Sequence, residues 1–340
     1  MTYNQCCDVE WKQATIGVTL VRASIVVVLI VVQIGCTPSY PHNADLDKEL
    51  AEQSRSDGLG IITTAPTFGT LPLTYFDGHG EQVRCCGKLR QTWAVSGGRQ
   101  LFAIDTSSFI LHPTAPELWE PNAFLFDVSG SELRRFPFWI RASFVAFSSD
   151  GKMIAFAGVA GSPQNRASRP VSGIAFGPLD GTAFREIYRT SQVTIGGEEP
   201  PHTLAWSPGG TEITYGRDGN VLVYDLLTGH SRPLANGSNP LWSPDGKWIS
   251  YRGPNGEAML IEPSGEHRTV LLRGQRITQA MYWSPDSRYL LTNLLVNYDG
   301  LLWAQPIVYR LRDGATTAAG EPLRGWANSA QDWVVTGKHL

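Results

Sequence analysis

The sequence is poor in charge and has no excess of either sign. Only 17% of its 340 residues are charged, and 28 Lys and Arg stand against 31 Asp and Glu, for a formal net charge of −3. Binding to nucleic acid depends on a basic patch or stripe that neutralises phosphates. The composition therefore gives no support to a nucleic-acid-binding function.

Familiar catalytic motifs are also missing. The sequence contains no Gly-x-Ser-x-Gly nucleophile elbow and no phosphate-binding P-loop, and its seven histidines include no pair at the spacing of a helical zinc motif. We therefore predict no catalytic residue, no metal and no cofactor. Enzymatic activity is left open, and a non-enzymatic role is favoured.

No apolar run is long enough to cross a membrane as a helix. Residues 23–35 form a 13-residue apolar stretch, whereas a transmembrane helix needs about 20 residues and the hydrophobic region of a signal peptide about 7–15. The end of this stretch, Gln33-Ile34-Gly35-Cys36, resembles a bacterial lipoprotein signal. The resemblance implies cleavage before Cys36 and acylation of that residue. An uncleaved signal anchor is the alternative, and both export the rest of the chain.

Cysteine is scarce, with five residues in the chain. A mature protein beginning at Cys36 would keep only the adjacent pair Cys85 and Cys86 as thiols. In an oxidising compartment such a pair either forms a strained vicinal disulfide or stays reduced, and the sequence leaves both states open.

Residues 37–71 are rich in Pro, Ser, Thr and Gly, and a short helix is predicted at Asp45–Ser54. Such a composition cannot bury a core of its own. We therefore divide the chain into a signal or anchor at 1–36, a flexible tether at 37–71 and a folded domain at 72–340.

The folded domain consists of a repeated unit, and the clearest copy is Leu241–Tyr251. Trp242 ends an apolar strand, Ser243-Pro244-Asp245-Gly246 has the residues of a tight turn, and an alternating strand follows. Related hairpins contain Trp206, Trp283 and Phe147, and weaker ones contain Trp93 and Trp326. Trp206 and Trp242 are 36 residues apart, near the roughly 40–45 of a four-stranded propeller blade.

Each of these inner hairpins except the one at Trp326 is followed by an outer hairpin, in which an apolar strand leads to a Gly turn and a second strand. The pairs give five blades, which start near Trp93, Val145, Leu204, Leu241 and Met281. An outer hairpin from Leu73 and an inner one from Trp326 remain, and together they complete a sixth blade. The prediction is an all-β, six-bladed propeller of four-stranded antiparallel blades, closed by N-terminal and C-terminal strands.

The Trp-Ser-Pro-Asp-Gly-Lys units over residues 72–340 resemble the repeats of TolB-like six-bladed β-propellers and of the propeller domain of prolyl oligopeptidases. The resemblance implies the fold and says little of the ligand, because the motif residues close hairpins. TolB carries an additional α/β domain before its propeller, for which residues 37–71 are too few. The chain is therefore not expected to be TolB itself.

Binding is expected on the propeller face that carries the longer connections, since long loops on a rigid scaffold usually hold binding residues. These connections are Thr106–Asn122, Val159–Val171, Thr190–His202 and Asn293–Gln305. The candidate binding residues in them are His112, Glu117, Trp119, Arg166, Arg169, Glu198, Glu199, His202, Tyr298 and Trp303.

Two functions follow from this organisation. The first is an exported, membrane-anchored module of the cell envelope, on the periplasmic side or at the cell surface, that binds an envelope protein or peptide. The alternative is an enzyme or carbohydrate-active propeller with a site at the channel mouth. Converging groups such as His112, Glu117, Glu199 and His202 around a metal would favour the alternative.

Overall fold

The computed structural model describes residues 40–57, 59–63, 73–76, 82–85, 100–104, 123–127, 132–136, 139–160, 171–190, 203–278, 280–298, 300–320, 322–324 and 330–335. The chain forms two units, Met1–Ser39 and Tyr40–Leu340, and every described residue belongs to the second. Cys36 and the predicted signal lie outside the described residues. Within the described part, no helix has both the length and the apolar character needed to cross a bilayer.

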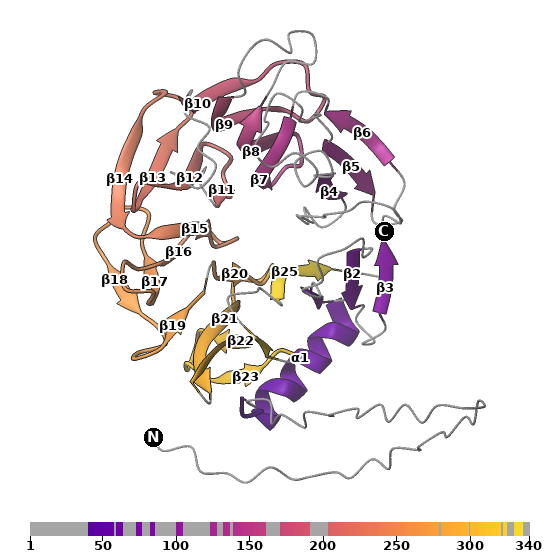
Figure 1. Cartoon of the computed structure of the whole chain (residues 1–340), viewed down its shortest axis with the longest axis vertical. Coiled ribbons are helices and arrows are strands. Elements are labelled where there is room, and N and C mark those ends of the chain that lie inside the picture. Colours follow the sequence, from indigo (N-terminus) through magenta and orange to yellow (C-terminus); the bar gives the residue numbers. More distant parts are fainter. Residues whose placement is uncertain are drawn as a thin grey trace, which may run out of the picture. The chain divides into compact units, whose positions relative to one another are not determined.

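The second unit is built almost entirely of antiparallel sheets (Figure 1). Three of them have four consecutive strands each and follow one another in the chain. The first sheet contains β7 (Trp139–Phe147), β8 (Met153–Ala160), β9 (Val171–Pro178) and β10 (Arg185–Thr190). The second contains β11 (Leu204–Trp206), β12 (Glu212–Arg217), β13 (Asn220–Asp225) and β14 (Ser231–Asn236). The third contains β15 (Ser238–Trp242), β16 (Ile249–Arg252), β17 (Ala258–Ile261) and β18 (Arg268–Val270).

The other sheets depart from this plan. One has six strands, one has three described strands, and one joins three N-terminal strands to a C-terminal one. The six-stranded sheet contains β19 (Arg276–Ile277), β20 (Tyr282–Trp283), β21 (Tyr289–Tyr298), β22 (Leu301–Arg310), β23 (Thr316–Ala318) and β24 (Leu323–Arg324). The sheet with three described strands contains β4 (Gln100–Ile104), β5 (Ala123–Asp127) and β6 (Glu132–Phe136). The last sheet contains β25 (Ala330–Val335), β1 (Leu59–Thr63), β2 (Leu73–Phe76) and β3 (Gln82–Cys85).

Successive sheets lie side by side. Strand β7 contacts β11, β12 contacts β15, and β15 contacts β20, which in turn contacts β25 (Figure 1). Apolar side chains fill the spaces between them: Phe176 and Trp206, from neighbouring sheets, meet edge to face with ring centroids 5.8 Å apart. The prediction is confirmed in its coarser part: the described residues are mostly β, with several four-stranded antiparallel sheets and one helix.

The repeated Ser-Pro-Asp-Gly turn is held by its own side chains. Ser243 Oγ donates to Asp245 Oδ1 at 2.7 Å, and Trp248 N donates back to Ser243 Oγ at 2.9 Å. Gly246 has a φ of 73°, which favours glycine. Ser284 and Asp286 repeat the arrangement, with Ser284 Oγ 2.6 Å from Asp286 Oδ1. The motif therefore stabilises a hairpin turn, as the sequence indicated.

The motif tryptophans also connect neighbouring sheets. Trp206 Nε1 donates to the Ala146 carbonyl oxygen at 3.1 Å, and Trp283 Nε1 donates to that of Leu241 at 3.2 Å. In both cases the acceptor belongs to the first strand of the preceding sheet. An indole that buries its ring and satisfies its N–H in this way fixes the spacing of two sheets.

The one described helix, α1 (Ala44–Asp57), has strong start signals. Asn43 caps it, since Leu46 N donates to Asn43 Oδ1 at 3.1 Å, and Asp45 and Asp47 lie in its first turn. Its most buried apolar side chain is Leu46, which is 0% exposed and packs with Tyr289, Leu291 and Val308, with Leu50 beside it. The predicted short helix is confirmed, and it packs on the sheet that contains β21 and β22.

Two features of the N-terminal region differ from the expected plan. Strand β1 pairs with both β2 and β25, so only one described C-terminal strand enters this sheet. The sequence suggested two C-terminal strands there. The helix and β1 also lie within residues 37–71, where a tether was predicted, and both belong to the β-rich unit.

Candidate functional site

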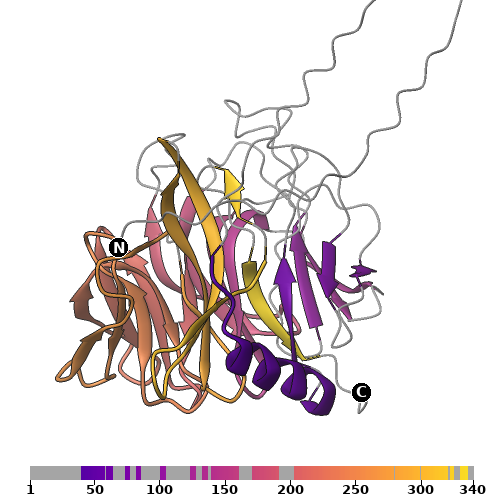
Figure 2. The same ribbon diagram turned by 90° about the horizontal axis from the view of Figure 1, so that it is seen from below.

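The described sheets have two distinct ends. The Ser-Pro-Asp-Gly turns and helix α1 lie at one end, which we call the tight-turn face (Figure 2). The connections between second and third strands lie at the other, which we call the loop face. It includes the turns Arg217–Asn220 and Gly253–Glu257 and the hairpin tip Tyr298–Leu301.

The connection Asn293–Gln305 is not a loop, contrary to the sequence prediction. Strands β21 and β22 pair without interruption from Tyr289↔Arg310 to Tyr298↔Leu301. The turn between them contains Gly300 with a φ of 71°. Asp-Gly flanked by β-forming residues is the usual sequence of such two-residue turns, and this hairpin extends past the ends of its neighbours (Figure 2).

The tip of this hairpin exposes large apolar side chains. Tyr298 is 36%, Leu301 38% and Leu302 37% exposed. Among the residues whose side chains are described, only Leu133 and Leu227 are further large hydrophobic residues with comparable exposure. Grouped exposed apolar side chains usually mark an interaction surface.

Two arginines lie beside each other next to this hairpin, because Arg276 pairs with Leu295 of β21. A Cβ placed on Gly256 would lie 3.0 Å from Arg276 Nε and 3.1 Å from Arg252 Nη2, so both guanidinium groups border the same small space. Arg252 is half-buried and is held by its Nε, which donates to the Ile277 carbonyl oxygen at 3.0 Å. Burial, and then the charge of Arg276, lower the pKa of Arg252.

The loop face also holds buried polar atoms that make no hydrogen bond. Within the described residues these are Thr203 Oγ1, Arg217 Nε, Asn239 Oδ1 and Trp303 Nε1. Arg217 Nε does lie 3.0 Å from Asp218 Oδ2 as an ion pair, but not in hydrogen-bond geometry. Buried polar atoms are normally satisfied, but Gln53 Oε1 and Trp242 Nε1, outside the loop face, also make no hydrogen bond, so these atoms alone do not single out one face.

The predicted binding residues fall into two groups. Tyr298 and Trp303 lie on the same hairpin, where Trp303 is half-buried and pairs across the strands with Val296. The others lie outside the described residues, as do Cys36 and Cys86: His112, Glu117, Trp119, Arg166, Arg169, Glu198, Glu199 and His202.

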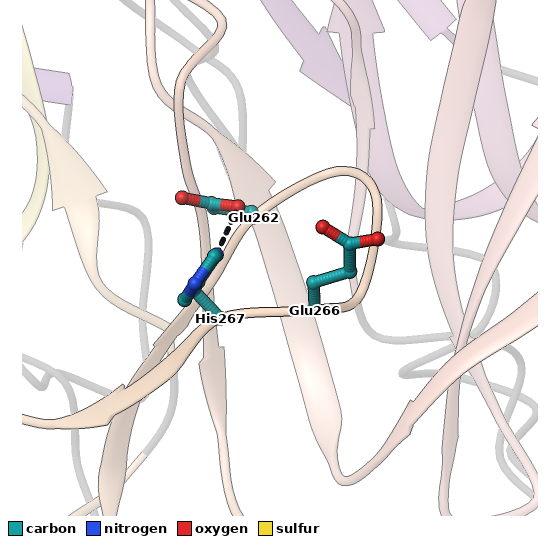
Figure 3. Close-up of side chains that lie close together, drawn as sticks. All are labelled: Glu262, Glu266 and His267. Atoms are coloured by element: carbon teal, nitrogen blue, oxygen red, sulfur yellow. Dashed lines mark hydrogen bonds and ion pairs between the residues drawn. The ribbon is translucent and has the colours of Figure 1, made fainter.

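Within the described part of the chain, one group of side chains has the composition of a metal site. Glu262, Glu266 and His267 bring their ligand atoms within 4.8 Å of one another in the turn between β17 and β18 (Figure 3). His267 Nδ1 is 2.8 Å from Glu262 Oε2, and this hydrogen bond raises the pKa of His267. Because Glu266 and His267 are exposed and already explained by turn geometry, we assign no metal to them.

Sequence reasoning missed the arginine pair and the exposed leucines of the loop face. Arg252 and Arg276 lie 24 positions apart, and only the fold brings them together. Leu301 and Leu302 follow the Asp-Gly turn signal, which could have identified the hairpin before the structure was known.

Comparisons with known proteins identify the fold of the chain. No protein-family model matches the sequence, and no curated protein matches it either. TolB from Acinetobacter baumannii superposes with a TM-score of 0.55 at 14% identity, over 83% of this chain and 69% of that one. A TolB candidate from Agrobacterium tumefaciens gives 0.52 at 16% identity, over 82% and 93%.

Both structures match over most of this chain, and the identities are too low to transfer a function. The likeness agrees with the Trp-Ser-Pro-Asp-Gly-Lys repeats and with the stacked four-stranded sheets. The chain is therefore a β-propeller protein with a TolB-like fold, and it is not TolB itself.

Proposed function

We propose that this protein is an exported, membrane-anchored propeller that binds a protein or peptide of the bacterial cell envelope through its loop face. The observation that carries the proposal is the β21–β22 hairpin, which holds exposed Tyr298, Leu301 and Leu302 on a paired, two-stranded support. Aromatic and aliphatic side chains on a rigid support lose little entropy on binding, which makes them effective interface anchors.

The proposed domain is a six-bladed propeller made of the six sheets, in which β25, β1, β2 and β3 form the blade that joins the chain ends. Residues 1–36 serve as the export signal and residues 37–71 link it to the domain at 72–340, with α1 and β1 of this link docked on the domain. Acylation at Cys36 would attach more than one acyl chain, as stable anchoring requires.

The anchoring half of the proposal is tested by intact mass and membrane fractionation of the wild-type chain and Cys36→Ser. We expect a wild-type mass that corresponds to cleavage before Cys36 plus acyl chains, in the membrane fraction, and an unprocessed variant. A wild-type chain that keeps residues 1–35 and carries no lipid would contradict lipid anchoring.

The binding half is tested by in-cell chemical crosslinking and capture. The double variant Leu301→Ser/Leu302→Ser should lose the crosslinked envelope complexes that the wild-type chain forms. Leu227→Ser is the matched control, since Leu227 is 94% exposed and follows β13, away from the hairpin. Equal complexes from all three chains would contradict binding through the loop face.

A further inference from the structure

We propose that the loop face recognises an extended acidic peptide segment, whose carboxylate binds between Arg252 and Arg276 and whose neighbouring apolar side chain packs on Leu302. This inference rests on the proposed function and names the chemistry of the partner. We call the residues involved, Arg252, Arg276, Leu295, Asn297 and Leu302, the acidic-peptide strip.

Strand register places four residues of the strip on one face of their sheet, and Arg252 reaches them from β16 of the preceding sheet. Arg276 pairs with Leu295, and Asn297 pairs with Leu302. Cross-strand partners point to the same side of a sheet, and so do alternate residues of one strand. Arg276, Leu295, Asn297 and Leu302 therefore share a side. With about 3.3 Å per residue and about 4.8 Å between strands, the Cα atoms of Arg276 and Leu302, two residues and two strands apart, are separated by roughly 12 Å.

Neither guanidinium group is in direct contact with a described carboxylate, and the charge of Glu257 only partly offsets the burial and the like charge that lower the pKa of Arg252. Within the described residues, no ion pair joins Arg252 or Arg276 to a carboxylate. The nearest acid in sequence is Glu257, and Asn255 occupies both of its oxygens, with N 3.0 Å from Oε2 and Nδ2 2.8 Å from Oε1. Two like charges around one space favour binding of an anion between them.

The position of Arg252 is fixed before any partner arrives. Its Nε donates to the Ile277 carbonyl oxygen, and Ile277 N donates to the Gly256 carbonyl oxygen at 2.8 Å. The guanidinium plane is thus held while Nη1 and Nη2 stay available on its other edge. A preorganised fork suits a carboxylate, which accepts two parallel hydrogen bonds.

A peptide agrees with the strip better than a membrane surface does. The cationic end is one half-buried and one exposed arginine around a single space, which suits one carboxylate. The exposed Asn297 amide lies between the cation and Leu302, where it can bond a peptide backbone. Lipid binding depends instead on a diffuse cluster of basic side chains.

The test is selection of a random linear peptide library on the purified full chain. We expect enriched peptides with Asp or Glu next to an apolar residue, and weaker binding as salt increases. Arg276→Ala should reduce the affinity of an enriched peptide about 10-fold or more. Arg273→Ala is the matched control, because Arg273 is exposed in the same connection, and it should change affinity less than about two-fold.

Charge reversal separates recognition from misfolding. Arg276→Glu should weaken the acidic peptides and bind the same peptides better when their acids are replaced by Lys, which a merely unfolded variant would not do. Enriched peptides that bind wild type and Arg276→Ala equally would overturn the strip and leave hairpin binding intact. Binding of phosphatidylglycerol vesicles without any enriched peptide would overturn the inference in favour of a lipid surface.

Discussion

The two faces of the described sheets differ in how their side chains are used, although buried polar atoms without a hydrogen bond occur on both, at Gln53 Oε1 and Trp242 Nε1 on the tight-turn side. On the tight-turn face, Ser243 and Asp245 bond each other and the turn backbone, and Asp286 Oδ2 accepts from Gln53 Nε2 of helix α1 at 2.8 Å. On the loop face, Arg217, Asn239 and their neighbours keep buried atoms without hydrogen bonds. The bonded turns and the docked helix stabilise the tight-turn face, whereas the loop face carries the exposed apolar tip of the β21–β22 hairpin, so the contrast favours stability at one face and binding at the other.

Helix α1 strengthens this contrast. Glu49 accepts hydrogen bonds from the Tyr289 hydroxyl, from Arg310 Nη1 at 2.6 Å and from Arg312 Nη2 at 2.9 Å. Thr317 Oγ1 donates to Asp47 at 2.6 Å. The helix thereby adds a satisfied ionic cluster to the tight-turn face, and the hairpin on the same sheet extends the opposite way (Figure 2).

The largest effect on stability should come from the helix. Leu46→Ala removes a fully buried side chain that packs with Leu291 and Val308, and should lower the free energy of unfolding by about 2–4 kcal/mol. Urea denaturation measures the loss. A loss no larger than that of Leu302→Ala, on the loop face, would show that the helix does not stabilise the sheet.

The motif turn should come next. Ser243→Ala deletes a buried hydroxyl that donates to Asp245 and accepts from Trp248 N, at a cost of about 1–3 kcal/mol. Ser264→Ala is the control, because exposed Ser264 accepts only one backbone hydrogen bond, at 3.2 Å, and should change stability by less than about 0.5 kcal/mol. Equal losses in urea denaturation would contradict the special role of the motif.

Acid should weaken the helix contact. The Tyr289 hydrogen bond, with help from Arg310 and Arg312, holds the pKa of Glu49 below its usual 4.5. The folded state therefore binds this proton less readily than the unfolded state, so the stabilisation is full above about pH 4.5 and is lost as the pH falls through the folded pKa. Urea midpoints should fall more between pH 5 and 3 in the wild type than in Glu49→Gln, and parallel curves would contradict this.

The hairpin tip should contribute little to stability. Leu302→Ser should change the free energy of unfolding by less than about 0.5 kcal/mol, because the side chain is already 37% exposed. The same variant should reduce the envelope complexes captured by crosslinking. A destabilised variant, or one with unchanged complexes, would remove the distinction between the two faces.

The smallest effect on stability should come from the exposed turn that holds His267 and Glu262. The hydrogen bond to Glu262 raises the pKa of His267, so its stabilisation is present below the unfolded value of 6.5 and is lost as the pH rises through the folded pKa. An NMR titration of the imidazole should show a lower pKa in Glu262→Gln than in the wild type. An unchanged titration would show that the pair does not persist in solution.

The sheets were predictable because the residues that form each turn are neighbours in the sequence. Trp242, Asp245 and Gly246 specify a hairpin through neighbouring residues alone, and the 36-residue spacing of Trp206 and Trp242 repeats it. The Arg252–Arg276 pair was not predictable, because it depends on how one sheet meets the next. Strand β1 was missed for a similar reason, since its partner β25 comes from the far end of the chain.

The most direct measurement is in-cell photocrosslinking with a photoreactive residue placed at position 302 or, in a second chain, at position 227. Both positions are exposed leucines, so incorporation itself perturbs the fold little. We expect a discrete crosslinked envelope protein from position 302 and none from position 227. A partner captured from position 227 alone would contradict the assignment of binding to the loop face.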